Sequence, residues 1–155
     1  MNNLSESNAI QDLYPDELAH CYGCGKNNPE GFQLKTYLKG DESIAHFSPE
    51  TKYTAIPGSV YGGLIASLLD CHGTGSAAAF FCKNENIPLE GIIPVRCVTA
   101  SLKVDFKAPT PLGIQLELKG KLRKIEGRKI WVDMTLSADG VICATGEILA
   151  IKIKD

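Results

Sequence analysis

The 155-residue chain is long enough for one domain with a sizeable core, and its 44% hydrophobic and 22% charged residues are an ordinary globular composition. The net charge of −2, without a block of Lys and Arg, argues against a nucleic-acid binder. No uninterrupted apolar run reaches the roughly 20 residues that span a bilayer, and the start MNNLSESNAIQDLYPDE lacks the features of a signal peptide. We therefore expect a cytoplasmic protein with neither a nucleic-acid nor a membrane partner.

The chain divides into a short N-terminal extension and a single domain. Residues 1–20 form the extension, which is polar at its start and has a short helical turn near residues 12–19. No internal repeat, low-complexity tract or long linker interrupts residues 21–155. The domain opens with CYGCGKNNPEG, whose Gly, Asn and Pro residues favour turns.

The same opening stretch contains a CxxC pair, Cys21 and Cys24, directly after His20. A structural zinc site normally needs four ligands, usually from two such pairs, and the sequence has no second pair. A thioredoxin-like redox role is disfavoured because residues 25–29 deny the pair a following helix. We therefore predict no metal site and reduced thiols throughout, since the other four cysteines lie in apolar segments, at Cys71, Cys82, Cys97 and Cys143.

Alternating apolar and polar residues predict a series of antiparallel strands. Residues 32–49 indicate two short strands around a turn at Gly40-Asp41. Four longer strands follow, at residues 98–106, 114–122, 130–136 and 141–153. Short glycine-bearing turns at 125–128 and 138–140 join neighbouring strands. Such a sheet has one apolar face that another element must cover.

The covering element is an Ala- and Leu-rich segment from Gly62 to Phe81, which lacks period-two alternation and proline. About 20 residues of helix span about 30 Å, enough to cross several strands. Its apolar residues lie on nearly every side, as in a helix that is buried all round. The expected fold class is α+β: a curved antiparallel β-sheet wrapped around one long central α-helix.

A single carboxylate, Asp70, stands near the middle of this apolar helix. Helical spacing aligns it with small residues on one face: Gly63, Ala66, Thr74 and Ala77. This face leaves room for a narrow ligand beside a carboxylate and a hydroxyl. Burying an unpaired carboxylate costs about several kcal/mol, so we favour a functional acid over a structural one held by backbone groups or a partner chain.

Two neighbours of Asp70 have different expected roles. Gly62 and Gly63 begin the helix, where unpaired N–H groups and the helix dipole favour an anion such as a developing oxyanion. His72 points about 200° away from Asp70 at about 100° per residue. A hydrogen-bonded structural histidine is therefore expected at His72, with a role across a dimer interface as the alternative.

Three segments, CYGCGKNNPEGFQL, PGSVYGGLIASLLD and TASLKVDFKAPTPLG, occur in an order that closely resembles the PaaI-like acyl-CoA thioesterases of the hotdog-fold superfamily. The resemblance covers about residues 21–151. It implies a hotdog fold and hydrolysis of an acyl-CoA thioester, with the CoA thioester as substrate and no separate cofactor. It also implies self-association as a homodimer or a dimer of dimers, with each site built between two protomers.

The resemblance also implies roles for the residues around the helix start. In that family an HGG motif opens the helix and an acid follows nine residues after the histidine; here Tyr61-Gly62-Gly63 and Asp70 occupy these positions. Asp70 is then the general base or nucleophile, the Gly62 N–H holds the oxyanion, and the Thr74 hydroxyl positions water or the leaving group. Tyr61 and Gly63 are expected to contact substrate.

Further substrate contacts follow from the same comparison and from charge. By the family comparison, the pantetheine arm runs beside Thr99, Ala100 and Ser101. Arg128 and Lys129 lie at a strand turn, where they are expected either to bind the phosphates of CoA or to form a solvated hairpin tip.

Two departures from the family pattern leave a second function open. Tyr61 replaces the motif histidine, and Ala55 stands where many relatives carry an Asn or Gln. Both are consistent with a protein that binds acyl-CoA without hydrolysing it. A hydratase on this fold is disfavoured, because such relatives carry an Asp and a His spaced five residues apart, and Asp70 and His72 are too close in sequence.

Overall fold

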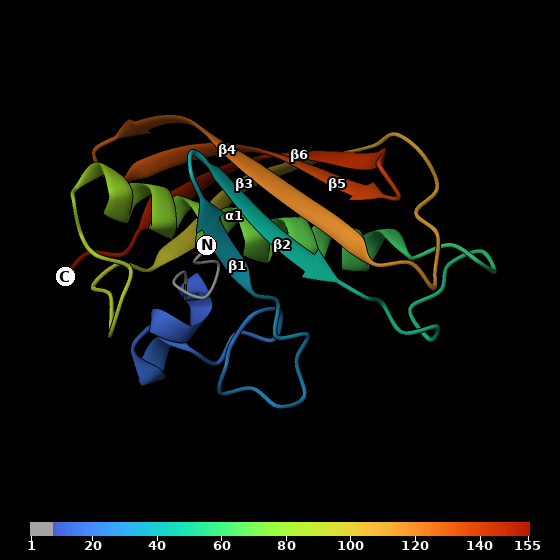
Figure 1. The fold of residues 1–155 in the computed structure, drawn as a ribbon, viewed down its shortest axis with the longest axis horizontal. Coiled ribbons are helices and arrows are strands. Elements are labelled where there is room, and N and C mark those ends of the chain that lie inside the picture. The colour runs from blue at the N-terminus through green and yellow to red at the C-terminus, as the bar shows by residue number, and fades with distance from the viewer. Residues whose placement is uncertain (1–7) are drawn as a thin grey trace, which may run out of the picture.

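A computed structural model describes residues 8–155 as a six-stranded antiparallel sheet packed on one long helix. The strands are β1 (Thr36–Lys39), β2 (Glu42–Phe47), β3 (Cys97–Phe106), β4 (Leu116–Glu126), β5 (Lys129–Ala138) and β6 (Val141–Lys152), in the spatial order β1-β2-β4-β5-β6-β3. Helix α1 (Gly62–Asn84) lies lengthwise against one face of the sheet (Figure 1). This arrangement confirms the predicted α+β class. No helix in residues 8–155 is long and apolar enough to cross a membrane.

The predicted turns join the strands where glycines permit it. Gly40-Asp41 links β1 to β2, and Gly127-Arg128 links β4 to β5. Asp139 and Gly140, with φ of 48° and 78°, link β5 to β6, and two successive positive φ angles match the twist of a two-residue hairpin. The local turn chemistry therefore fixed the antiparallel neighbours correctly.

Helix α1 begins at the predicted Gly62 and ends at Asn84, one turn later than expected. Two helical glycines allow it to lie close to its neighbours. A Cβ at Gly73 would lie 2.7 Å from Ile148 Cδ1 of β6, and a Cβ at Gly75 would lie 2.5 Å from Gln11 Nε2. The helix thus packs directly against both the sheet and the N-terminal segment.

A buried polar cluster around His72 ties α1 to the first hairpin. His72 Nδ1 lies 3.0 Å from Thr36 Oγ1, and Nε2 lies 3.2 Å from Ser43 Oγ, which in turn lies 2.6 Å from Ser76 Oγ. Burial lowers the pKa of His72 to about 3, so the ring is neutral at pH 7. The prediction of a hydrogen-bonded structural histidine is confirmed.

The described part of the N-terminal extension packs against the same helix. One helical turn was expected near residues 12–19; the structure has two short 3₁₀ turns, η2 (Ile10–Leu13), which overlaps the start of that range, and η3 (Asp16–Leu18), which lies within it. Ile10 and Tyr14 join the hydrophobic core. The predicted domain boundary at residue 20 stays a prediction. Residues 1–7 of the extension lie outside the described range.

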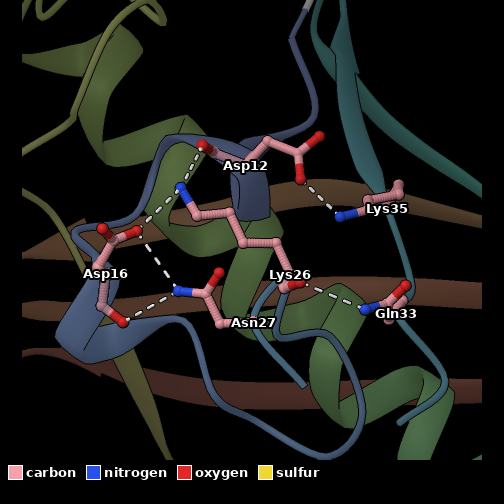
Figure 2. Close-up of polar contacts among 6 residues, drawn as sticks. All are labelled: Asp12, Asp16, Lys26, Asn27, Gln33 and Lys35. Carbon is pink, nitrogen blue, oxygen red and sulfur yellow. Dashed lines mark hydrogen bonds and ion pairs between the residues drawn. The ribbon is translucent and has the colours of Figure 1, made fainter. Parts of the chain in front are cut away.

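Polar contacts join these turns to the segment of residues 21–35, which begins with the cysteine-bearing loop (residues 21–31) (Figure 2). Lys26 Nζ donates to the Asp12 carbonyl at 3.2 Å and lies 3.6 Å from Asp16 Oδ1. Asn27 Nδ2 donates to Asp16 Oδ1 at 3.3 Å, and Lys35 Nζ pairs with Asp12 Oδ1 at 2.5 Å. The N-terminal turns and the loop after them therefore form one connected unit.

Strand β3 forms a long edge of the sheet. Among residues 8–155 it pairs only with β6, so its other side carries free backbone groups. Val98 and Phe106 on this strand are 47% and 57% exposed. Long exposed edges of this kind are normally covered or paired, because they can template further strands.

Candidate active site

The carboxylate of Asp70 lies half-buried on α1, next to the exposed edge strand. Its Oδ1 accepts a hydrogen bond from Thr99 Oγ1 of β3. The resemblance had assigned Thr99 to substrate binding; the structure places it against the acid itself.

A β-bulge in β3 accompanies this contact. Thr99 pairs with Ala150 of β6 and Ser101 pairs with Leu149, so Ala100 is an extra residue between them. Bulges locally re-aim side chains and are common beside active sites. This bulge could not be predicted, because the alternation of apolar and polar residues runs through it unbroken.

The small-residue face of α1 is open only at its N-terminal half. Gly63 is exposed and Ala66 is half-buried like Asp70, whereas Thr74 and Ala77 are buried. Thr74 Oγ1 donates to the Cys71 carbonyl at 3.2 Å, a bond within the helix. The prediction of a helix buried on all sides is therefore wrong, since the N-terminal half of this face points outward.

The start of α1 offers backbone donors beside a surface pocket. Tyr61 makes no side-chain capping bond, and the first N–H groups of a helix have no partner within it. A pocket of about 380 Å³ adjoins this end and is lined by Gly62, Ile65, Phe106 and Thr110, among others. Phe106 lies directly over Gly62, where a Cβ would be 3.3 Å from the ring.

Tyr61 folds back over the next turn of the helix. A Cβ at Gly63 would lie 2.6 Å from Tyr61 Cε2, so glycine is needed for this placement of the ring. Tyr61 also continues a chain of aromatic contacts beside the helix start, formed by Tyr22, Phe32, Phe47, Tyr53 and Tyr61. Sequence reasoning missed this apolar wall, because its members come from separate segments without a shared period.

The predicted acid and the predicted oxyanion donor do not meet within one chain. Gly62 and Asp70 are separated along the helix axis by about 12 Å, at about 1.5 Å per residue. A single thioester carbonyl cannot contact both groups at hydrogen-bond distance. Any site that uses both therefore takes them from two copies of the chain.

The basic residues proposed for CoA lie at the exposed β4–β5 turn. Arg128 Nη1 donates to the Lys152 carbonyl at 2.9 Å. Lys129 pairs with Ile151 of β6, which pairs in turn with Val98 of β3. The turn therefore lies at the same end of the sheet as Thr99, about 10 Å across two strand spacings from the β3 edge.

Comparison with known proteins identifies the family. The model of the thioesterase superfamily matches residues 57–144. A thioesterase superfamily protein from Shewanella loihica PV-4 is 43% identical, with a TM-score of 0.69 over 90% of this chain and 98% of that one. A Streptococcus mutans protein solved bound to acetyl CoA shares the fold at 14% identity and a TM-score of 0.62, over 79% of this chain and 90% of that one.

The curated relatives are longer proteins. The acyl-coenzyme A thioesterase THEM4 of Rattus norvegicus is 37% identical over 110 residues, which is 70% of this chain and 42% of the relative. The chain spans about half the length of the curated relatives it matches. Because the family model and the Shewanella loihica structure both match, the chain belongs to the thioesterase superfamily, and its long helix packed on an antiparallel sheet is the hotdog fold.

Proposed function

We propose that this protein hydrolyses an acyl-CoA thioester to a free acid and CoA. The observation that carries the proposal is the Asp70 carboxylate, which is held by Thr99 on an otherwise small-residue helix face beside the exposed β3 edge. Family membership supports the reaction class, as does the similarity to the acyl-coenzyme A thioesterases THEM4. The acetyl CoA bound by the Streptococcus mutans protein supports the substrate class.

In this mechanism Asp70 acts on the thioester carbonyl in one of two ways. As a general base it takes a proton from water while the water oxygen attacks the carbonyl carbon. As a nucleophile its carboxylate attacks directly, and water then hydrolyses the resulting anhydride. In both routes the carbon–sulfur bond breaks and the CoA thiolate leaves, then takes up a proton.

The negative charge that develops on the carbonyl oxygen needs preorganised donors. The Gly62 N–H at the uncapped start of α1 supplies one. Thr99 orients Asp70. The Thr74 hydroxyl, one turn beyond the acid, is buried and donates within its own helix, so its proposed part in positioning water or the leaving group is limited to accepting a hydrogen bond at its oxygen.

We assign this site to a dimer formed along β3. A two-fold axis that pairs two β3 edges in antiparallel fashion also sets the two α1 helices antiparallel. The helix start of one copy then lies beside the middle of the other, so that Gly62 and Asp70 from opposite chains face one carbonyl. Further association into a dimer of dimers is compatible with this arrangement.

The substrate contacts follow from the same placement. The pantetheine arm runs along Thr99, Ala100 and Ser101, all exposed on the β3 edge. Arg128 and Lys129 supply positive charge at the same end of the sheet. Tyr61 and Gly63 contact the acyl group at the start of α1, where the apolar wall formed by the aromatic side chains lies beside it.

The test is thiol release from a panel of short, long and aromatic acyl-CoAs. Asp70→Asn keeps the shape of the side chain but cannot act as a base, so hydrolysis is expected to fall on the order of a hundredfold or more. Asp139→Asn is the matched control, because this exposed turn residue has φ of 48°, which Asn tolerates. Full activity in Asp70→Asn would remove the acid from the mechanism.

A second function, acyl-CoA binding without turnover, is favoured by one observation. The ring of Tyr61, which replaces the histidine of the family motif, covers Gly63 at the helix start. Tyrosine is a poor base at neutral pH, with a reference pKa near 10. Absence of hydrolysis across the panel, together with a higher melting temperature in the presence of acyl-CoA, would select this function.

The cytoplasmic location stays a prediction from the sequence.

A further inference from the structure

Three cysteine sulfurs meet where the cysteine-bearing loop contacts the central helix. The Sγ atoms of Cys21, Cys24 and Cys71 all lie within 4.8 Å of one another, and the Cys21–Cys71 separation is 3.8 Å. The sequence predicted no metal because it holds no second CxxC pair. The structure supplies the third thiol from α1, a contact that sequence spacing does not show.

The loop is shaped to present its two thiols on one side. The Gly25 N–H donates to the Cys21 carbonyl at 2.7 Å and closes a tight turn. A Cβ at Gly23 would collide with the Cys71 sulfur, so glycine lets the turn lie directly on the helix.

Contacts of the residues that follow the turn hold this cluster in place. Lys26 and Asn27, the residues that follow the turn, are tied to Asp12 and Asp16 (Figure 2).

The geometry suits a tetrahedral thiolate-bound ion. Zinc–sulfur bonds are about 2.3 Å long, so two sulfurs on a tetrahedral zinc lie about 3.8 Å apart. Thiolates select soft cations such as zinc over magnesium or calcium. Three thiolates and one Zn²⁺ leave a single net negative charge.

We propose that Cys21, Cys24 and Cys71 bind one zinc ion as three thiolates. Binding releases three protons from the thiols. The Cys21 side chain is half-exposed while the other two are buried, so the ion enters past Cys21 and water completes its coordination. Within residues 8–155 no fourth protein ligand joins the group.

The zinc would fasten the loop to α1 at the residue directly after Asp70. Its role is structural, because a bound ion that the unfolded chain binds less tightly stabilises the folded state. This inference does not depend on the hydrolase activity, and its test does not measure that activity.

The test uses the whole chain, purified with its thiols reduced and then stripped of metal. Addition of zinc is expected to load one ion per chain, measured by elemental analysis after gel filtration. Addition of Co²⁺ instead should give thiolate-to-cobalt charge-transfer absorption, which reports sulfur ligation. Loss of a residue that only supports a metal ligand weakens metal binding by up to about 100-fold. Cys21→Ser removes a ligand itself, so it should weaken zinc binding by more than this.

Cys143→Ser is the matched control, since Cys143 lies on β6 outside the cluster, and it should bind zinc as the wild type does. Circular dichroism establishes that each variant is folded. A wild-type chain with six reduced thiols that takes up no zinc would overturn the site, as would zinc affinity retained in Cys21→Ser. If Cys21→Ser fails to fold, alkylation of wild-type Cys21 decides the matter: protection by zinc supports the site, and unchanged labelling rejects it.

Discussion

Thr99 donates a hydrogen bond to the carboxylate of Asp70, so the edge strand β3 orients the acid on the central helix. A hydrogen bond to an ionised acceptor is stronger than one between neutral groups. Because Thr is β-branched, its side chain has few rotamers to lose. The bulge at Ala100 lies next to this residue, so a change in the edge strand is expected to reach the acid through this one contact.

Replacement of Thr99 tests this link. Thr99→Val keeps the shape of the side chain but removes the donor, and hydrogen bonds to charged groups contribute about 1.5–3 kcal/mol. We expect kcat for the best acyl-CoA to fall about tenfold to a hundredfold, since 1.4 kcal/mol is about tenfold in rate. Thr99→Ser retains the hydroxyl and should recover most of the rate. Equal rates for Thr99→Val and the wild type would leave the bond without a catalytic role.

The Gly62 N–H can be removed without disturbing the helix. Gly62 is the first helical residue, and proline is well tolerated there because that N–H has no partner within the helix. Tyr61 already has φ of −70° and ψ of 146°, which is the conformation required before a proline. Gly62→Pro should therefore lower kcat by about 10²–10³, the cost of one oxyanion donor.

Gly62→Ala is the matched control for this measurement. Both substitutions place a Cβ 3.3 Å from the Phe106 ring, but only alanine keeps the N–H. A large loss of rate in Gly62→Pro and a small one in Gly62→Ala would support the backbone donor. Similar losses in both variants would instead assign the effect to crowding against Phe106.

The elements of this fold could be predicted because their causes are local. Period-two alternation, positive-φ turn residues such as Asp139 and Gly140, and a proline-free apolar segment each act through neighbouring residues. The same reasoning placed Asp70 on the small-residue face of α1 and gave His72 a structural role. In each case the information lies within a few residues of the chain.

The contacts around the candidate site could not be predicted, because they join segments that are distant in sequence. Cys71 completes a cluster with the N-terminal loop, Thr99 reaches Asp70 from another element, and Phe106 lies over Gly62. No period or motif links these partners. They arise only from how closely α1 approaches the cysteine-bearing loop and the edge strand β3.

The exposed edge of β3 predicts dependence of activity on self-association. Val98→Lys places a charge on this edge, where the valine is 47% exposed, and should convert a dimer to a monomer in light scattering. Because the oxyanion donor would then be missing, thioester hydrolysis should fall on the order of a hundredfold. Val141→Lys, at a residue 57% exposed beside the β5–β6 turn, should change neither property. A wild type that is both monomeric and active would contradict the shared site.

Burial of His72 predicts a specific loss of stability in mild acid. Its pKa falls from 6.5 to about 3 on folding, so between these values the unfolded chain binds a proton that the folded chain does not. The free energy of unfolding rises with pH where the unfolded state binds more protons. This contribution is complete above about pH 6.5 and is lost by up to about 1.4 kcal/mol per pH unit as the pH falls below it.

Urea unfolding between about pH 5 and 7 isolates this effect, because most carboxylates titrate below that range. His72→Gln should be less stable at pH 7, since it disrupts the bonds to Thr36 and Ser43, but its stability should depend less on pH. His46→Gln is the control, because His46 is exposed on β2 beside Glu117. His46→Gln should keep the slope of the wild type, and a slope with pH that survives in His72→Gln would show that the neutral buried ring is not its source.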